Sequence, residues 1–147
     1  MLYPIGIQDF EKLREGNYLY IDKTQLIYEL ASGFGYYFLS RPRRFGKSLL
    51  ISTMEAYFLG KKELFKGLAM EQLEQDWTVY PVLHLDLNTR NYIDKDSLTE
   101  ELNRHLEMWE SIYGDQYKSR KVEERFYHIV RLASEQTGQK VVILIDE

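Results

Sequence analysis

The strongest constraint on the fold is a run of five aliphatic residues, 141–145, that leads directly into two acidic residues. A short uninterrupted run of this kind indicates a strand buried on both faces, as in a parallel sheet. Residues 36–40 are aromatic-rich and bounded by turn signals, and residues 82–87 follow a proline, so both segments also predict strands. Parallel strands need long crossover connections. We therefore expect an α/β protein with helices on both sides of a mostly parallel sheet.

Apolar residues at helical spacing predict the helices that accompany these strands. Asp9 and Asp22 are placed as N-caps of two short helices near the N-terminus. The second of these helices, 23–32, carries Leu26, Ile27 and Leu30 on one face. Further helices are predicted over residues 47–60, 98–109 and 122–138, shorter helical pieces over residues 61–77, and a loop over residues 88–96.

Composition excludes several classes of protein. A chain of 147 residues suits one domain, and a 44% hydrophobic content excludes general disorder. The absence of cysteine excludes disulfides, thiolate metal sites and cysteine nucleophiles. No apolar run approaches the about 18 residues of a membrane span and no signal peptide is present, so we expect a cytoplasmic protein without membrane contact. The net charge of −4 and the dispersed basic residues give only weak support for nucleic-acid binding.

The segment between the first predicted strand and the following helix contains Gly46, Lys47 and Ser48. Backbone N–H groups at a helix N-terminus bind anions, and the helix dipole favours negative charge there. Lys47 would reach the β- and γ-phosphates of a nucleotide, and the Ser48 hydroxyl would ligate magnesium. Gly46 has no side chain to obstruct a phosphate oxygen. This pattern predicts a phosphate-binding loop that continues into Leu49.

The loop departs from the full P-loop pattern at its start, where Arg41 replaces the first glycine. Pro42 can impose the turn instead, because it fixes its own φ and restricts the preceding residue. Arg43 and Arg44 would stabilise phosphate charge, contact DNA or pair with acidic side chains. The alternative interpretation of these arginines and Lys47 is a solvated basic patch.

The acidic pair after the last predicted strand has the form of a Walker B segment. In such a segment the Asp, here Asp146, holds magnesium, and the following Glu147 polarises the attacking water. Ligands of open α/β sheets bind beyond the carboxyl ends of the strands, where Asp86 and Asn88 are further candidates. The alternative interpretation is a buried strand that runs into a polar turn.

Together these segments resemble the bacterial AAA-ATPase-like family, in the ASCE branch of P-loop ATPases. The resemblance covers nearly the whole chain. It is carried by residues 4–10, 20–24, 38–48 and 144–147, and the sequence Arg-Pro-Arg-Arg-Phe-Gly-Lys-Ser at 41–48 looks like that family's own form of the loop.

The resemblance implies a P-loop NTPase fold, a three-layer α/β/α sandwich with a mostly parallel sheet. Residues 1–147 would be the N-terminal portion of one such domain, with a helical lead-in over residues 1–34. The loop Arg43, Arg44, Phe45, Gly46, Lys47, Ser48 and Leu49 would bind the nucleotide. Related ATPases have a strand-to-helix element that packs near the adenine, and residues 20–25 look similar to it, which adds Asp22 to the cofactor-binding residues.

The leading functional expectation is ATP binding and, in the intact protein, Mg²⁺-dependent ATP hydrolysis with Lys47 and Glu147 as catalytic residues. The alternatives are a nucleotide-gated regulatory module with little turnover, or the ATPase part of a nucleic-acid-directed protein with a PD-(D/E)XK nuclease-like domain, as family members often have. In the ASCE arrangement a later strand separates the P-loop strand from the Walker B strand. We therefore expect the fold to be incomplete at 147, the chain alone to be poorly active, and its open strand edges to favour self-association.

Overall fold

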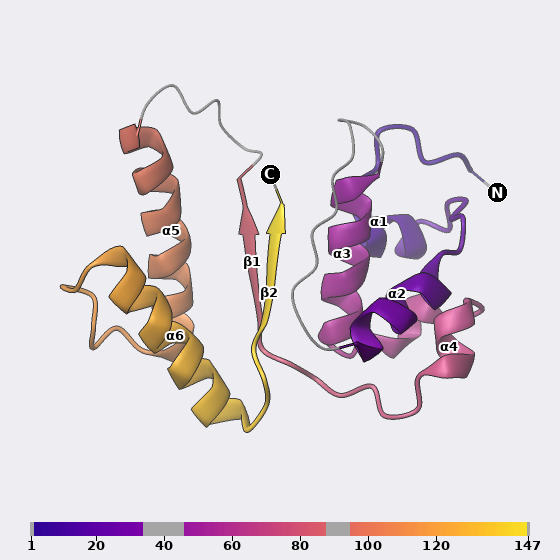
Figure 1. Ribbon diagram of the computed structural model, residues 1–147. Coiled ribbons are helices and arrows are strands. Elements are labelled where there is room, and N and C mark those ends of the chain that lie inside the picture. The colour runs from indigo at the N-terminus through magenta and orange to yellow at the C-terminus, as the bar shows by residue number, and fades with distance from the viewer. Residues whose placement is uncertain (1, 34–45, 88–94, 147) are drawn as a thin grey trace. The chain divides into compact units, whose positions relative to one another are not determined.

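The structure is a computed structural model that describes residues 2–33, 46–87 and 95–146 (Figure 1). The chain forms two compact units, an N-terminal unit over Met1–Val79 and a C-terminal unit over Tyr80–Glu147. The predicted strand at 36–40 and most of the predicted loop at 88–96 lie outside the described residues. No helix in the described ranges is long and apolar enough to cross a membrane.

The N-terminal unit is helical in its described part. Its elements are α1 (Phe10–Glu15), α2 (Thr24–Ser32), α3 (Lys47–Phe58), the 3₁₀ helix η1 (Lys62–Phe65) and α4 (Ala69–Leu73). Asp9 is the N-cap of α1, as predicted, because its carboxylate accepts a hydrogen bond from the Lys12 N–H at 2.9 Å. The expected helix from Lys47 and the shorter pieces after it are confirmed.

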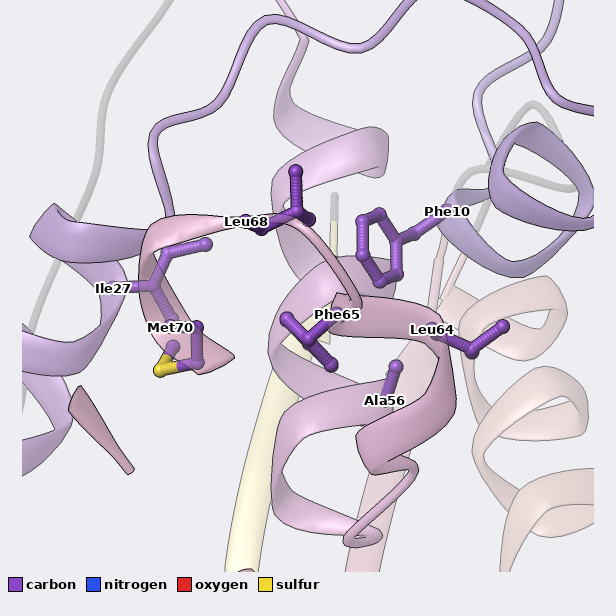
Figure 2. Close-up of a cluster of buried hydrophobic side chains, with 7 residues drawn as sticks. All are labelled: Phe10, Ile27, Ala56, Leu64, Phe65, Leu68 and Met70. Carbon is purple, nitrogen blue, oxygen red and sulfur yellow. The ribbon is translucent and has the colours of Figure 1, made fainter. Parts of the chain in front are cut away.

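A single cluster of buried apolar side chains holds these helices together (Figure 2). The rings of Phe10 and Phe65 lie 4.9 Å apart at its centre. Ile27 of α2 is buried, but Leu26 is 62% exposed, so the prediction for Leu26 was wrong. Thr24 and Ile27 define the buried side of α2, and Leu26 is turned about 100° away from Ile27. The cluster consists of Phe10, Ile27, Ala56, Leu64, Phe65, Leu68 and Met70.

The C-terminal unit contains a two-stranded parallel sheet and two helices in its described part. Its elements are β1 (Val82–Asp86), α5 (Lys95–Tyr113), α6 (Val122–Thr137) and β2 (Val142–Asp146). The strands pair in register from Val82 with Val142 to Asp86 with Asp146, and their arrows in Figure 1 point the same way. The expected α/β class and the parallel pairing are therefore confirmed. Residues 95–96, expected in a loop, already belong to α5.

The core of the C-terminal unit lies between β1 and the two helices. Leu83 packs there with Leu106, Trp109 and Ile129. The expected burial of both faces of the last strand is not observed, because Ile143 and Ile145 are 41% and 55% exposed. The reason is that this apolar cluster takes side chains from β1 and from both helices but none from β2.

Candidate functional site

The phosphate-binding candidate lies at the first turn of α3. Gly46 precedes the helix in the left-handed region, at φ 80° and ψ 18°, and its carbonyl accepts the Leu50 N–H at 2.9 Å. Only glycine adopts this conformation without strain, and a Cβ atom built on Gly46 has no neighbour within 4 Å. Lys47 and Ser48 follow as the first helical residues. The first N–H groups of a helix have no acceptor within it, so this end suits an anion.

Two hydroxyl groups one turn further along α3 donate hydrogen bonds to its first turn. The Leu49 carbonyl accepts hydrogen bonds from Ser52 Oγ at 2.9 Å and from Thr53 Oγ1 at 2.6 Å. Ser52 Oγ also accepts the backbone N–H of Phe10 at 3.0 Å, which ties α3 to the start of α1. This role of Ser52 was not predicted from the sequence. Its partner Phe10 is 42 residues away, so no local sequence signal marks the contact.

Asp22, predicted among the cofactor-binding residues, has both carboxylate oxygens in hydrogen bonds. Oδ1 accepts from the Thr24 N–H at 2.9 Å and from Thr24 Oγ1 at 2.6 Å, and Oδ2 accepts from the Ala69 N–H at 2.7 Å. Partial burial by itself raises the pKa of Asp22, but the hydrogen bonds from Thr24 and Ala69 outweigh it, and the pKa is lowered. The N-cap residue of α2 is Lys23 and not Asp22, so that prediction was wrong, and the Asp22 carboxylate instead joins the start of α2 to the start of α4.

The second predicted element lies at the carboxyl ends of β1 and β2. Asp86 and Asp146 are register partners in the parallel pair. The ladder continues one step further, because the Leu87 N–H donates to the Asp146 carbonyl at 2.8 Å. Asp146 is buried and Asp86 is half-buried. Paired residues of neighbouring strands direct their side chains to the same face of a sheet, so two carboxylates lie side by side at this edge.

A histidine of α5 contacts the same edge. His105 Nδ1 lies 2.9 Å from the Glu101 carbonyl oxygen, and its Nε2 lies 3.3 Å from the backbone nitrogen of Asp86. The sequence predicted no role at a site for His105. Its place near Leu102 and Leu106 on the apolar side of a predicted helix was the signal that it faces the sheet.

Comparison with known proteins identifies the family. Residues 4–147 match the family described as Predicted AAA-ATPase, which is nearly the whole chain. This chain belongs to the AAA-ATPase-like family. It is also 39% identical over 146 residues to a protein of Azotobacter chroococcum mcd 1 described as "Uncharacterized protein in vnfD 5'region". That match covers 98% of this chain and 28% of the relative's length. No solved structure matches the chain.

The described part of this AAA-ATPase-like chain contains some of the predicted site residues. Gly46 to Leu49 and Asp22 belong to the N-terminal unit, and Asp146 belongs to the C-terminal unit. Arg43, Arg44, Phe45 and Glu147 lie outside the described residues. Within the described ranges there is no group of three or more His, Asp or Glu side chains arranged to hold a metal ion. The magnesium ligands therefore stay a prediction.

Proposed function

We propose that this chain binds ATP and that the intact protein hydrolyses it with magnesium. The observation that carries the proposal is the start of α3, where a left-handed Gly46 is followed by Lys47 and Ser48 at the N-terminus of a 12-residue helix. Gly-Lys-Ser is the end of the P-loop pattern, and a helix N-terminus is the place where that triplet binds phosphate in such loops. The family match over residues 4–147 supports the same conclusion.

In the proposed site, Walker A residues 41–48 cradle the phosphates. Backbone N–H groups at the start of α3 donate to phosphate oxygens, and the Lys47 ammonium neutralises the β- and γ-phosphates. Phe45 and Leu49 contribute backbone donors on either side of this turn. Arg43 and Arg44 add positive charge next to the phosphates. Asp22 is proposed to lie near the base or sugar of the nucleotide.

Walker B residues 141–147 supply the acidic groups. Ser48 and Asp146 would hold magnesium, and their hydroxyl and carboxylate oxygens are the hard donors that this ion prefers. When bound, magnesium would neutralise part of the phosphate charge. Glu147 orients the attacking water and accepts its proton. The parallel pairing of β1 and β2 supports the finer proposal that both strands belong to the sheet of a three-layer P-loop fold.

Calorimetric titration of Mg·ATP into Lys47→Ala tests the binding. Loss of a charge-assisted contact to phosphate should weaken ATP binding by about 10- to 100-fold. Lys12→Ala is the matched control, because Lys12 is an exposed lysine of α1 in the same unit and the variant loses the same charge. Equal affinities of the two variants would refute the assignment of Lys47.

Turnover measured on Glu147→Gln tests hydrolysis separately. If Glu147 is the base, hydrolysis should slow by about 100-fold or more while ATP affinity stays within about twofold. Unaltered hydrolysis would remove Glu147 from the mechanism. A wild-type protein that binds ATP and shows no turnover would favour the alternative, a nucleotide-gated module.

A further inference from the structure

We propose that His105 is a positioning residue of the proposed ATPase site, which holds the carboxyl end of β1 and, through it, the backbone at Asp146. The inference rests on the proposed function, in which Asp146 is a magnesium ligand. His105 itself contacts neither nucleotide nor metal in this proposal. All the contacts that carry it lie within the C-terminal unit.

The two neighbours of the ring fix its tautomer. Nδ1 faces the Glu101 carbonyl oxygen at 2.9 Å, and a carbonyl oxygen can only accept a hydrogen bond. Nε2 faces the Asp86 N–H at 3.3 Å, and a backbone N–H can only donate. The ring that satisfies both partners is neutral, with its proton on Nδ1 and its lone pair on Nε2.

The contact to Asp86 satisfies one backbone donor on the outer edge of β1. Successive N–H groups of a strand point to opposite edges. The Leu87 N–H points toward β2 and donates to the Asp146 carbonyl at 2.8 Å, so the preceding N–H, that of Asp86, points away from β2. His105 Nε2 accepts this N–H from α5. A helix side chain thus takes the place of a neighbouring strand at the residue where the sheet presents its carboxylates.

Packing holds the ring in this position. His105 is 4% exposed, and its ring centroid lies 5.7 Å from that of Trp109, which belongs to the apolar core. The buried Glu101 carboxylate lies 3.6 Å from Nδ1 and also pairs with Arg104. A ring that is enclosed in this way keeps its donor and acceptor aimed at fixed backbone atoms.

Two backbone contacts carry the position of α5 to Asp146. His105 Nε2 accepts the Asp86 N–H. The residue after Asp86, Leu87, donates its N–H to the Asp146 carbonyl. If the first contact is lost, the end of β1 shifts or frays, and the backbone that carries the proposed magnesium ligand loses its support. Displacement of a catalytic group by about 1 Å can cost about 100-fold in rate.

Substitution of His105 by glutamine or asparagine distinguishes the roles of the two ring nitrogens. The side-chain amide of His105→Gln reaches the place of Nε2 and can accept the Asp86 N–H, whereas that of His105→Asn reaches only the place of Nδ1. Without nucleotide, hydrogen exchange at the Asp86 and Leu87 amides should be about tenfold faster in His105→Asn and close to wild type in His105→Gln. Nitrogen chemical shifts of wild-type His105 should report the tautomer protonated at Nδ1.

The functional readout is the magnesium dependence of ATP binding. His105→Asn should need about tenfold more Mg²⁺ for half-maximal ATP binding, while its affinity for ATP in EDTA stays unchanged, and His105→Gln should restore the wild-type requirement. Equal exchange rates in the two variants, or the opposite tautomer, would overturn the contact. If wild type binds Mg·ATP and both variants have the same magnesium requirement as wild type, only the role of His105 is refuted and the proposed function stands. A wild type without Mg·ATP affinity refutes the proposed function, and the positioning role falls with it.

Discussion

The carboxylate of Asp22 accepts a hydrogen bond at 2.7 Å from the backbone N–H of Ala69, which is 47 residues further along the chain. Thr24 extends this contact, because its buried hydroxyl donates to Asp22 at 2.6 Å and accepts the Met70 N–H at 3.0 Å. Two consecutive N–H groups at the start of α4 therefore have side-chain acceptors from the start of α2. A helix of five residues cannot satisfy these donors itself.

We predict that Thr24→Val lowers the free energy of unfolding by about 1–3 kcal/mol. Valine has nearly the same shape as threonine, so the change removes the hydroxyl and leaves the buried Met70 N–H without its acceptor. The control is Thr99→Val, the same substitution at an exposed residue of α5, which should change stability by less than about 0.5 kcal/mol. Urea denaturation measures both. Equal stabilities of the two variants would show that the hydroxyl does not support α4.

Asp22→Asn tests the lowered pKa of this carboxyl. A group whose pKa is lower in the folded state stabilises the protein above its unfolded pKa, and this stability is lost as pH falls through the folded pKa. We therefore expect wild type to lose stability on acidification from about pH 4 downward, and Asp22→Asn to show a shallower loss. Urea midpoints between pH 2.5 and 6 measure the difference. Identical pH dependence would contradict the hydrogen-bonded state of Asp22.

The buried ion pair between α5 and α6 leads to a third prediction. Arg125 donates to both oxygens of Glu110, at 2.5 and 3.3 Å, and both residues are buried. Arg125→Met leaves the Glu110 charge buried without its partner, so we expect a loss of about 3–5 kcal/mol. The double variant Arg125→Met/Glu110→Leu should recover most of this loss, because neither charge remains. Thermal unfolding of the single and double variants measures the difference, and a double variant no more stable than the single one would contradict it.

Most of the secondary structure was predictable because periodicity and caps are local signals. Local residues mark the start of the helix at Lys47 and the end of the helix at Thr137. The latter is followed by Gly138, which adopts the left-handed conformation. The error at Leu26 has a different origin. Leu26 and Ile27 are adjacent and point about 100° apart in a short helix. Which of the two is buried depends on packing that the local sequence does not encode.

In the candidate site, too, the features marked by local sequence were predictable and the contacts between distant residues were not. The glycine at the start of α3 and the acidic residues at the strand ends follow from residue type and spacing, and the structure places Gly46 and Asp146 in such positions. The contacts of Ser52 and His105 were not predictable, because each hydrogen-bonds to a backbone N–H far away in the sequence. Any residue except proline offers that donor, so no sequence pattern marks the partner.

Gly46 offers a sharp test of phosphate binding, because Gly67 is a matched control. The two glycines have φ values of 80° and 81°, and a Cβ atom built on either has no neighbour within 4 Å. An alanine at either position should therefore cost the same backbone strain, about 1–2 kcal/mol of stability. Only Gly46→Ala places a methyl group where the proposed phosphate approaches the backbone.

We expect Gly46→Ala and Gly67→Ala to unfold at similar urea concentrations, and only Gly46→Ala to lose ATP affinity, by about tenfold or more. Denaturation and calorimetric titration on the same preparations measure both quantities. Equal losses of affinity would assign the effect to general destabilisation. Full affinity in Gly46→Ala would show that no phosphate oxygen approaches this glycine, and would remove the start of α3 as the phosphate site.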